Sequence, residues 1–222
     1  MRRSFPLLFL GALALLSCVI VRHDEKDAGK TKGALEIYFA DGSFDAKAYV
    51  GELWDARLLP YSIEKSTELG SLIERLNADE ASASLEFGRR QVAEGAPFNF
   101  AVKGEARMLK VDTESRVGIA ELDLIPSAGG PADGKADALL QIGPVFKGSS
   151  IRDALPFVSF DDFVNQLDYA ALSNELNARV RDSVFSGTDP SRMTGKRLVF
   201  YGFITYERGK AIVVTPVRLE WK

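Results

Sequence analysis

The sequence has very little cysteine and histidine, with one residue of each among 222. The single cysteine, Cys18, ends an N-terminal apolar run, and the single histidine, His23, lies in a charged stretch just behind it. The rest of the chain therefore cannot form a disulfide, a Ser-His-Asp or Cys-His catalytic centre, or a zinc site of His and Cys ligands. We expect no metal, no cofactor and no enzymatic activity.

Long hydrophobic runs and an excess of positive charge are also missing. The apolar run over residues 5–16 is shorter than the roughly twenty residues that a membrane-spanning helix needs, and no second run is long enough. Lys and Arg number 28 against 31 Asp and Glu, which gives a net charge of −3. Because phosphate binding requires clustered Lys and Arg, nucleic acid is not expected as a partner.

The N-terminus has the organisation of a secretory signal, with Arg2 and Arg3 before the apolar run. Its last residues, 15–18 (LLSC), resemble the lipobox of bacterial lipoproteins. In such proteins the peptide is cut before the cysteine, the thiol receives diacylglycerol and the new amine is acylated. The resemblance implies that residues 1–17 are removed and that lipid on Cys18 anchors the protein to a membrane. In the alternative interpretation this is a plain signal peptide whose cysteine is incidental.

The mature chain divides into a tether and one α+β domain. Residues 18–33 are charged and lack periodicity, which is typical of a flexible tether. The domain covers residues 34–222, with a helical part over 43–97 and a barrel part over 98–222. A short strand is expected at 35–39, before the helical part.

Apolar spacing defines the expected helices of the helical part. The first follows Ser43, which is expected to cap it, and Pro60 is expected to end or kink it. A second helix is expected over 63–76, and a short third one lies before Gly95. The buried face of the first helix is predicted to consist of Tyr49, Val50, Leu53 and Trp54.

From Phe98 onward the apolar period changes to two, which indicates strands. The expected order is three strands, a long helix and two strands, with Gly104 marking a bulge or sharp coil in the first strand. This order predicts an antiparallel OB-like small β-barrel with the helices as an added layer. The alternative is an open antiparallel sheet covered on one face by helices. The expected strands are 98–111, 116–125, 138–146, 197–206 and 210–221, and the helix is 159–184.

Arg152 and Asp153 stand in the connection before the long helix. In one interpretation Arg152 binds an anionic or hydroxylated ligand at the mouth of the barrel. In the other, which we favour at this point, the pair bonds backbone groups and orders the loop.

Three amides on the long helix are further candidates for ligand binding. Asn174 falls within an apolar stripe with Leu167, so it is expected to be buried and to bind a neighbouring loop. Gln166 and Asn177 share a more polar side, which would suit sugar hydroxyls. The alternative is an ordinary solvated or interface face.

Two other patterns carry weaker hypotheses. Glu121 and Asp123 alternate on one strand and would provide the paired carboxylates of a glycoside hydrolase, although acids on an exposed strand are common. A group of aromatic residues would provide a stacking platform of the kind that OB barrels use. Its members are Phe200, Tyr201, Phe203 and Tyr206.

Five segments resemble an uncharacterised family of predicted bacterial periplasmic lipoproteins, often found beside sugar ABC-transporter components. The resemblance implies where the protein is located and which genes lie beside its own, but it implies no mechanism. The segments are 44–60 (FDAKAYVGELWDARLLP), 100–124 (FAVKGEARMLKVDTESRVGIAELDL), 141–157 (QIGPVFKGSSIRDALPF), 162–177 (DFVNQLDYAALSNELN) and 195–204 (GKRLVFYGFI).

Together these observations predict a non-enzymatic, lipid-anchored periplasmic lipoprotein that assists a sugar or solute ABC uptake system. The alternative is a saccharide- or small-molecule-binding OB-like module, and a carboxylate-dependent hydrolase is a third hypothesis. Val19 is not the aspartate that usually retains lipoproteins at the inner membrane, which favours the outer membrane. The sequence leaves the oligomeric state open.

Overall fold

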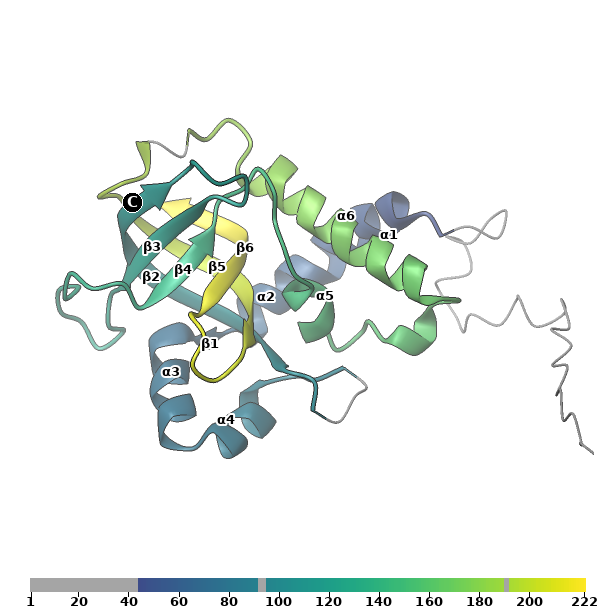
Figure 1. The fold of residues 1–222 in the computed structure, drawn as a ribbon, viewed down its shortest axis with the longest axis horizontal. Coiled ribbons are helices and arrows are strands. Elements are labelled where there is room, and N and C mark those ends of the chain that lie inside the picture. Colours follow the sequence, from purple (N-terminus) through teal and green to yellow (C-terminus); the bar gives the residue numbers. More distant parts are fainter. Residues whose placement is uncertain (1–43, 92–94, 190–191) are drawn as a thin grey trace, which may run out of the picture. The chain divides into compact units, whose positions relative to one another are not determined.

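The computed structural model describes residues 44–91, 95–189 and 192–222 (Figure 1). The predicted leader, Cys18, the tether and the strand predicted at 35–39 lie outside these residues. Among the described residues, no helix is both long enough and apolar enough to cross a membrane. The fold is mixed α+β, with helices around one six-stranded sheet.

The first helical segment has the predicted buried face, but it is capped by a different residue and continues beyond Pro60. Helix α1 (Ala46–Leu53) is capped by Asp45 and not, as predicted, by Ser43; the Asp45 carboxylate accepts a 2.9 Å hydrogen bond from the Ala48 amide. A π-helical turn (Trp54–Leu58) then leads directly into α2 (Leu59–Lys65). Of the two expectations, that Pro60 ends or kinks the helix, the first is wrong, because proline is tolerated in the first turn of α2. The four predicted core residues are all buried.

The helix predicted over 63–76 is interrupted. The two-residue strand β1 (Thr67–Glu68) pairs in parallel with β2 and separates α2 from α3 (Leu69–Ala78). Glu68 then caps α3 by accepting a 2.7 Å hydrogen bond from the Ser71 amide. Helix α4 (Glu80–Phe87) is the predicted short third helix.

Five longer strands follow the predicted order, with the long helix between the third and the fourth. They are β2 (Phe98–Asp112), β3 (Ile119–Leu124), β4 (Ala138–Gln141), β5 (Arg197–Tyr206) and β6 (Val213–Trp221).

Hydrogen bonding runs through the strands in the order β1-β2-β3-β4-β6-β5, and β5 also pairs with β2. The sheet is not purely antiparallel as expected, because β4 pairs in parallel with β6 and β1 with β2. The parallel β4–β6 pair arises because β5 and β6 form an antiparallel hairpin and β6 returns beside β4. The OB-like element order from Phe98 onward is thus present.

Gly104 and the aromatic residues of β5 explain how the core is filled. A Cβ atom on Gly104 would lie 2.9 Å from the Phe200 ring, so the glycine makes room for that ring. The register irregularity in β2 instead lies between Met108 and Val111. Phe200 and Phe203 are fully buried, so the predicted stacking platform does not form from these two rings.

The long helix begins later than predicted and buries a different face. A short helix α5 (Ser150–Ala154), not predicted, comes first. Ser159 and Asp162 form a capping box on a 3-10 turn (Phe160–Asp162), and α6 (Gln166–Val184) is capped by Asn165. Helix α6 packs beside α1 and against β6 (Figure 1).

Helix α6 carries two apolar stripes, one through Leu167 and Asn174 and one through Leu172 and Leu176, and the expectation that the first is buried is wrong. Leu167 is 80% exposed and Asn174 is exposed, although both were placed on a buried stripe. Only the other stripe reaches the core, because neighbouring elements cover one side of the helix. Its buried residues are Tyr169, Leu172, Ser173, Leu176 and Val180.

Candidate functional site

Arg152 projects from α5 into a set of contacts with α6. Its Nε donates a 2.8 Å hydrogen bond to Asp153 Oδ1, and its Nη1 donates a 2.9 Å bond to the Tyr169 carbonyl oxygen. The guanidinium carbon also lies 3.6 Å from the centroid of the Tyr169 ring, in cation–π geometry. The side chain is only 13% exposed. Arg152 is therefore bound on several sides by groups of the protein itself.

Asp153 completes this arrangement. Its carboxylate accepts hydrogen bonds from Ser149 Oγ at 2.5 Å and from the Tyr169 hydroxyl at 3.1 Å, in addition to Arg152. Burial, reinforced by the Asp153 carboxylate and opposed by the Arg152 charge, raises the pKa of Tyr169 to about 12. The Arg152–Asp153 pair thus ties α5 to α6, in agreement with the loop-ordering interpretation.

These residues also line a hollow of about 310 Å³, which we call the Arg152 hollow. Strands β2 and β5 contribute Asn99 and Thr205, and the Thr205 hydroxyl donates a 2.6 Å bond to Asn99 Oδ1. Phe160 and Tyr169 add aromatic surface, with their rings edge to face and 5.3 Å apart. The full lining is Gln91, Ala96, Pro97, Asn99, Ser149, Arg152, Asp153, Phe160, Tyr169 and Thr205.

The structure does not bring all the predicted residues together. Of the five candidates in the described chain, only Arg152 and Asp153 line this hollow. Gln166 and Asn174 are exposed on α6. Asn177 donates a 2.9 Å hydrogen bond to the Gly148 carbonyl, so it holds the loop before α5.

Sequence reasoning missed Gln91, Asn99, Ser149 and Tyr169. These residues lie far apart along the chain, and no local spacing connects them. Only the packing of α5 against β2 and β5, and of α6 against α5, brings them to one place.

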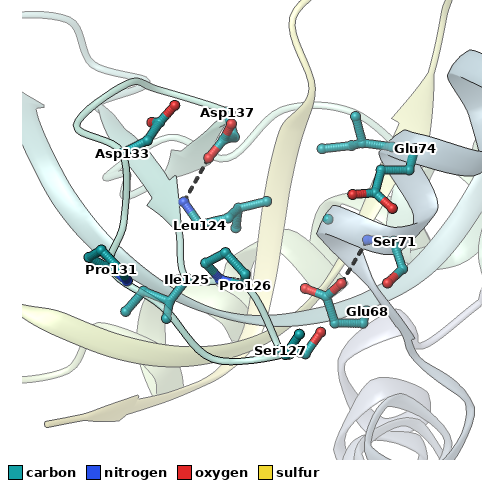
Figure 2. A pocket seen from close by; sticks show the side chains of 13 residues that line it. Glu68, Ser71, Glu74, Leu124, Ile125, Pro126, Ser127, Pro131, Asp133 and Asp137 are labelled. Carbon is teal, nitrogen blue, oxygen red and sulfur yellow. Dashed lines mark hydrogen bonds between the residues drawn. The ribbon is translucent and has the colours of Figure 1, made fainter.

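A larger hollow of about 440 Å³ lies between α3 and the loop after β3. Figure 2 shows Glu68 and Glu74 on one side of it, and Asp133 and Asp137 on the other. Three of these carboxylates accept backbone hydrogen bonds: Glu68 from Ser71, Asp137 from Leu124 and Asp133 from Lys135. Glu68 caps a helix, Asp133 caps a turn, and Asp137 joins the two ends of the loop between β3 and β4.

Glu121 and Asp123, the acidic pair considered for hydrolysis, differ in how deeply they are buried. Asp123 is buried, and its two oxygens accept bonds from the Asp133 and Gly134 amides, whereas Glu121 is half-buried. Asp123 therefore holds the loop between β3 and β4. Within residues 44–91, 95–189 and 192–222, no group of three or more His, Cys, Asp or Glu side chains is placed to hold a metal ion.

Comparison with known proteins adds a fold and a family. The chain is similar to the crystal structure of an OB-fold protein from Thermotoga maritima, with a TM-score of 0.60 and 17% identity. The similarity covers 81% of this chain and 99% of that one, and it supports the fold alone. None of the curated proteins matches the chain. The model of a family described as predicted periplasmic lipoprotein (DUF2291) matches residues 8–220. The chain therefore belongs to this family of predicted periplasmic lipoproteins.

Proposed function

We propose that the protein is a non-enzymatic lipoprotein, anchored through lipid on Cys18, that binds a solute of the saccharide class in the Arg152 hollow. The observation that carries the proposal is the lining of this hollow, which combines aromatic rings with amide, hydroxyl, carboxylate and guanidinium groups from six parts of the fold. Small-molecule sites are concave and mostly apolar, with a few polar groups in defined positions. The volume of about 310 Å³ suits a small ligand.

The polar groups of the hollow are held in place before any ligand arrives. Asn99 is buried and accepts from Thr205, and Ser149 donates to Asp153. Such fixed groups lose little conformational entropy on binding, which favours affinity. The pairing of β2 with β5 supports a closed OB-like barrel as the rigid scaffold beneath them.

Thermal denaturation tests this proposal. The Tm of the full chain in neutral detergent is measured with each member of a panel of neutral mono- and oligosaccharides. At a concentration about 100-fold above Kd, a sugar stabilises the folded state by about 2.7 kcal/mol. This corresponds to a rise in Tm of several degrees. Phe160→Ala should abolish the rise. Phe157→Ala, on a half-buried ring outside the hollow, should preserve it. A flat response of the wild type to every sugar would overturn the proposal.

We also propose that the protein serves an uptake system of the ABC type and resides on the outer membrane. The family supports a periplasmic lipoprotein. The resemblance described above implies the uptake system, and Val19 after Cys18 favours the outer membrane. Affinity purification from membranes that express such a system should recover its binding protein or permease. Cys18→Ser should prevent lipid attachment and reduce the recovery. Recovery of no transporter component would refute the proposed partner. Fractionation of the protein with the inner membrane would refute the proposed location. Neither result would bear on the proposal of saccharide binding.

A further inference from the structure

Arg89 follows α4 and is fixed against β2 by its backbone. Its N–H donates a 2.8 Å bond to the Asn99 carbonyl, and the Asn99 N–H donates a 2.7 Å bond back to the Arg89 carbonyl. Gly88 permits this close approach, since a Cβ atom there would lie 2.9 Å from the Phe100 ring. The position from which the Arg89 side chain starts is therefore well defined.

The guanidinium of Arg89 differs from most others in the molecule. Its Nε is buried and has no hydrogen-bond partner. The ion pairs found among the described residues engage other arginines, such as Arg75, Arg152 and Arg197, and none engages Arg89. A guanidinium carries five N–H donors and keeps its charge at any physiological pH. A buried donor without a partner is costly, so a group that supplies acceptors would be bound favourably.

A hollow of about 360 Å³ opens beside this guanidinium, and we call it the Arg89 hollow. Lys65 adds a second positive charge, again without an ion pair among the described residues. Glu86 is the one carboxylate in the described lining, and it lies 3.7 Å from Arg75. The lining is Tyr61, Lys65, Thr67, Glu86, Phe87, Gly88, Arg89, Asn99, Ala101, Ala154 and Pro156.

The positive charge of Arg89 acts on the hydroxyl group of Tyr61 in this hollow. Burial raises the pKa of Tyr61, and the nearby Arg89 charge opposes that rise. Tyr61 and Thr67 line the hollow together with the two cations, and the Tyr61 hydroxyl donates a 3.5 Å hydrogen bond to the Ala154 carbonyl oxygen. Oxyanions are recognised by this combination, because a planar guanidinium forms paired hydrogen bonds with carboxylate or phosphate oxygens.

We propose that the Arg89 hollow binds an oxyanion, the carboxylate or phosphate group of a small solute, with Arg89 as the principal donor and Lys65 as the second charge. The site is separate from the Arg152 hollow, although Asn99 lines both. It does not depend on the saccharide proposal, because its argument rests on the unpaired guanidinium.

Titration with inorganic phosphate tests the site. The full chain in neutral detergent is titrated at constant ionic strength, with chloride as the reference anion, and binding is followed by calorimetry and by Tm. Wild type should bind phosphate, and Arg89→Met should lose at least tenfold in affinity. Arg90→Met removes the same charge from the neighbouring exposed arginine, which lies over the Phe98 ring, and should leave affinity within twofold.

Two further arms keep the outcome decisive. If Arg89→Met does not fold, Arg89→Lys should fold and bind phosphate less tightly than wild type, because it keeps the charge but not the fork of donors. Vesicles of phosphatidylcholine with and without phosphatidylglycerol identify the source, since Arg89-dependent binding only to the vesicles that contain phosphatidylglycerol indicates a lipid headgroup. Equal phosphate affinity in wild type and both Arg89 variants, or none in wild type, would overturn the proposal. Loss of sugar binding in Phe160→Ala with intact phosphate binding separates the two sites.

Discussion

Arg152 and Arg89 lie beside neighbouring hollows that share Asn99, yet they occupy opposite situations. Arg152 has a carboxylate, a carbonyl and an aromatic ring around it. Arg89 has a buried Nε without a partner and no ion pair to a carboxylate in the described parts of the chain. Both arginine side chains are partly buried, but only the charge of Arg152 is paired with a carboxylate among the described residues.

The difference separates a structural role from a binding role. A charge that is paired inside the protein fixes the elements that carry it, here α5 and α6. Removing one member of such a pair leaves its partner buried and uncompensated, which costs more than the pair contributes. A charge without a partner adds little to the fold and is available to a ligand. The following three predictions test this distinction.

The largest effect is expected from Arg152→Met. It leaves the Asp153 carboxylate, 15% exposed, without its cation, and it removes the bond to the Tyr169 carbonyl. We expect the free energy of unfolding to fall by about 2–4 kcal/mol in urea denaturation. Arg181→Met is the matched control, because Arg181 also pairs with the next residue, Asp182, but on the exposed surface. Its effect should stay within experimental error, and equal losses in both variants would contradict the structural role of Arg152.

A pH-dependent effect is expected for Tyr169, whose pKa is raised to about 12, chiefly by burial. Between pH 10 and 12 the unfolded chain loses this proton while the folded chain keeps it, so stability falls as the pH rises. Relative to Tyr169→Phe, wild type should lose up to about 1.4 kcal/mol for each pH unit in this window. Below pH 9 the two curves should run parallel. Parallel curves up to pH 12 would show that the hydroxyl is not held in its neutral form.

The smallest effect is expected from Arg89→Met in phosphate-free buffer. Because the buried Nε has no partner, its removal should change the free energy of unfolding by less than about 1 kcal/mol, or increase it slightly. Urea denaturation in chloride measures this directly. A loss of unfolding free energy as large as that expected for Arg152→Met would show that Arg89 has a structural role. The two arginines would then not differ in the way described here.

Local patterns predicted much of the fold correctly. The spacing of Tyr49, Val50, Leu53 and Trp54 identified a buried helix face that the structure confirms. The change to a period of two at Phe98 located the start of β2. These features depend on residues within one or two turns, where backbone geometry alone relates the side chains.

Features that depend on distant partners were predicted poorly. The apolar stripe through Leu167 was expected to be buried, but Leu167 is exposed, and no element among the described residues covers it. Strand β1 interrupts an apparent helix because β2 offers a pairing edge to Thr67 and Glu68. The unpaired state of Arg89 has no signature in sequence, since it depends on which carboxylates fold near it.

By itself, the sequence determined the order of the five longer strands and the long helix, the scarcity of thiol and imidazole chemistry, and a lipoprotein-like N-terminus. These properties follow from composition and local spacing. The tertiary structure decided which face of α6 is buried, that β5 pairs with β2, and that Arg152 is satisfied while Arg89 is not. The physical reason is that burial and charge compensation belong to pairs of residues far apart in the chain, and only packing brings such pairs together.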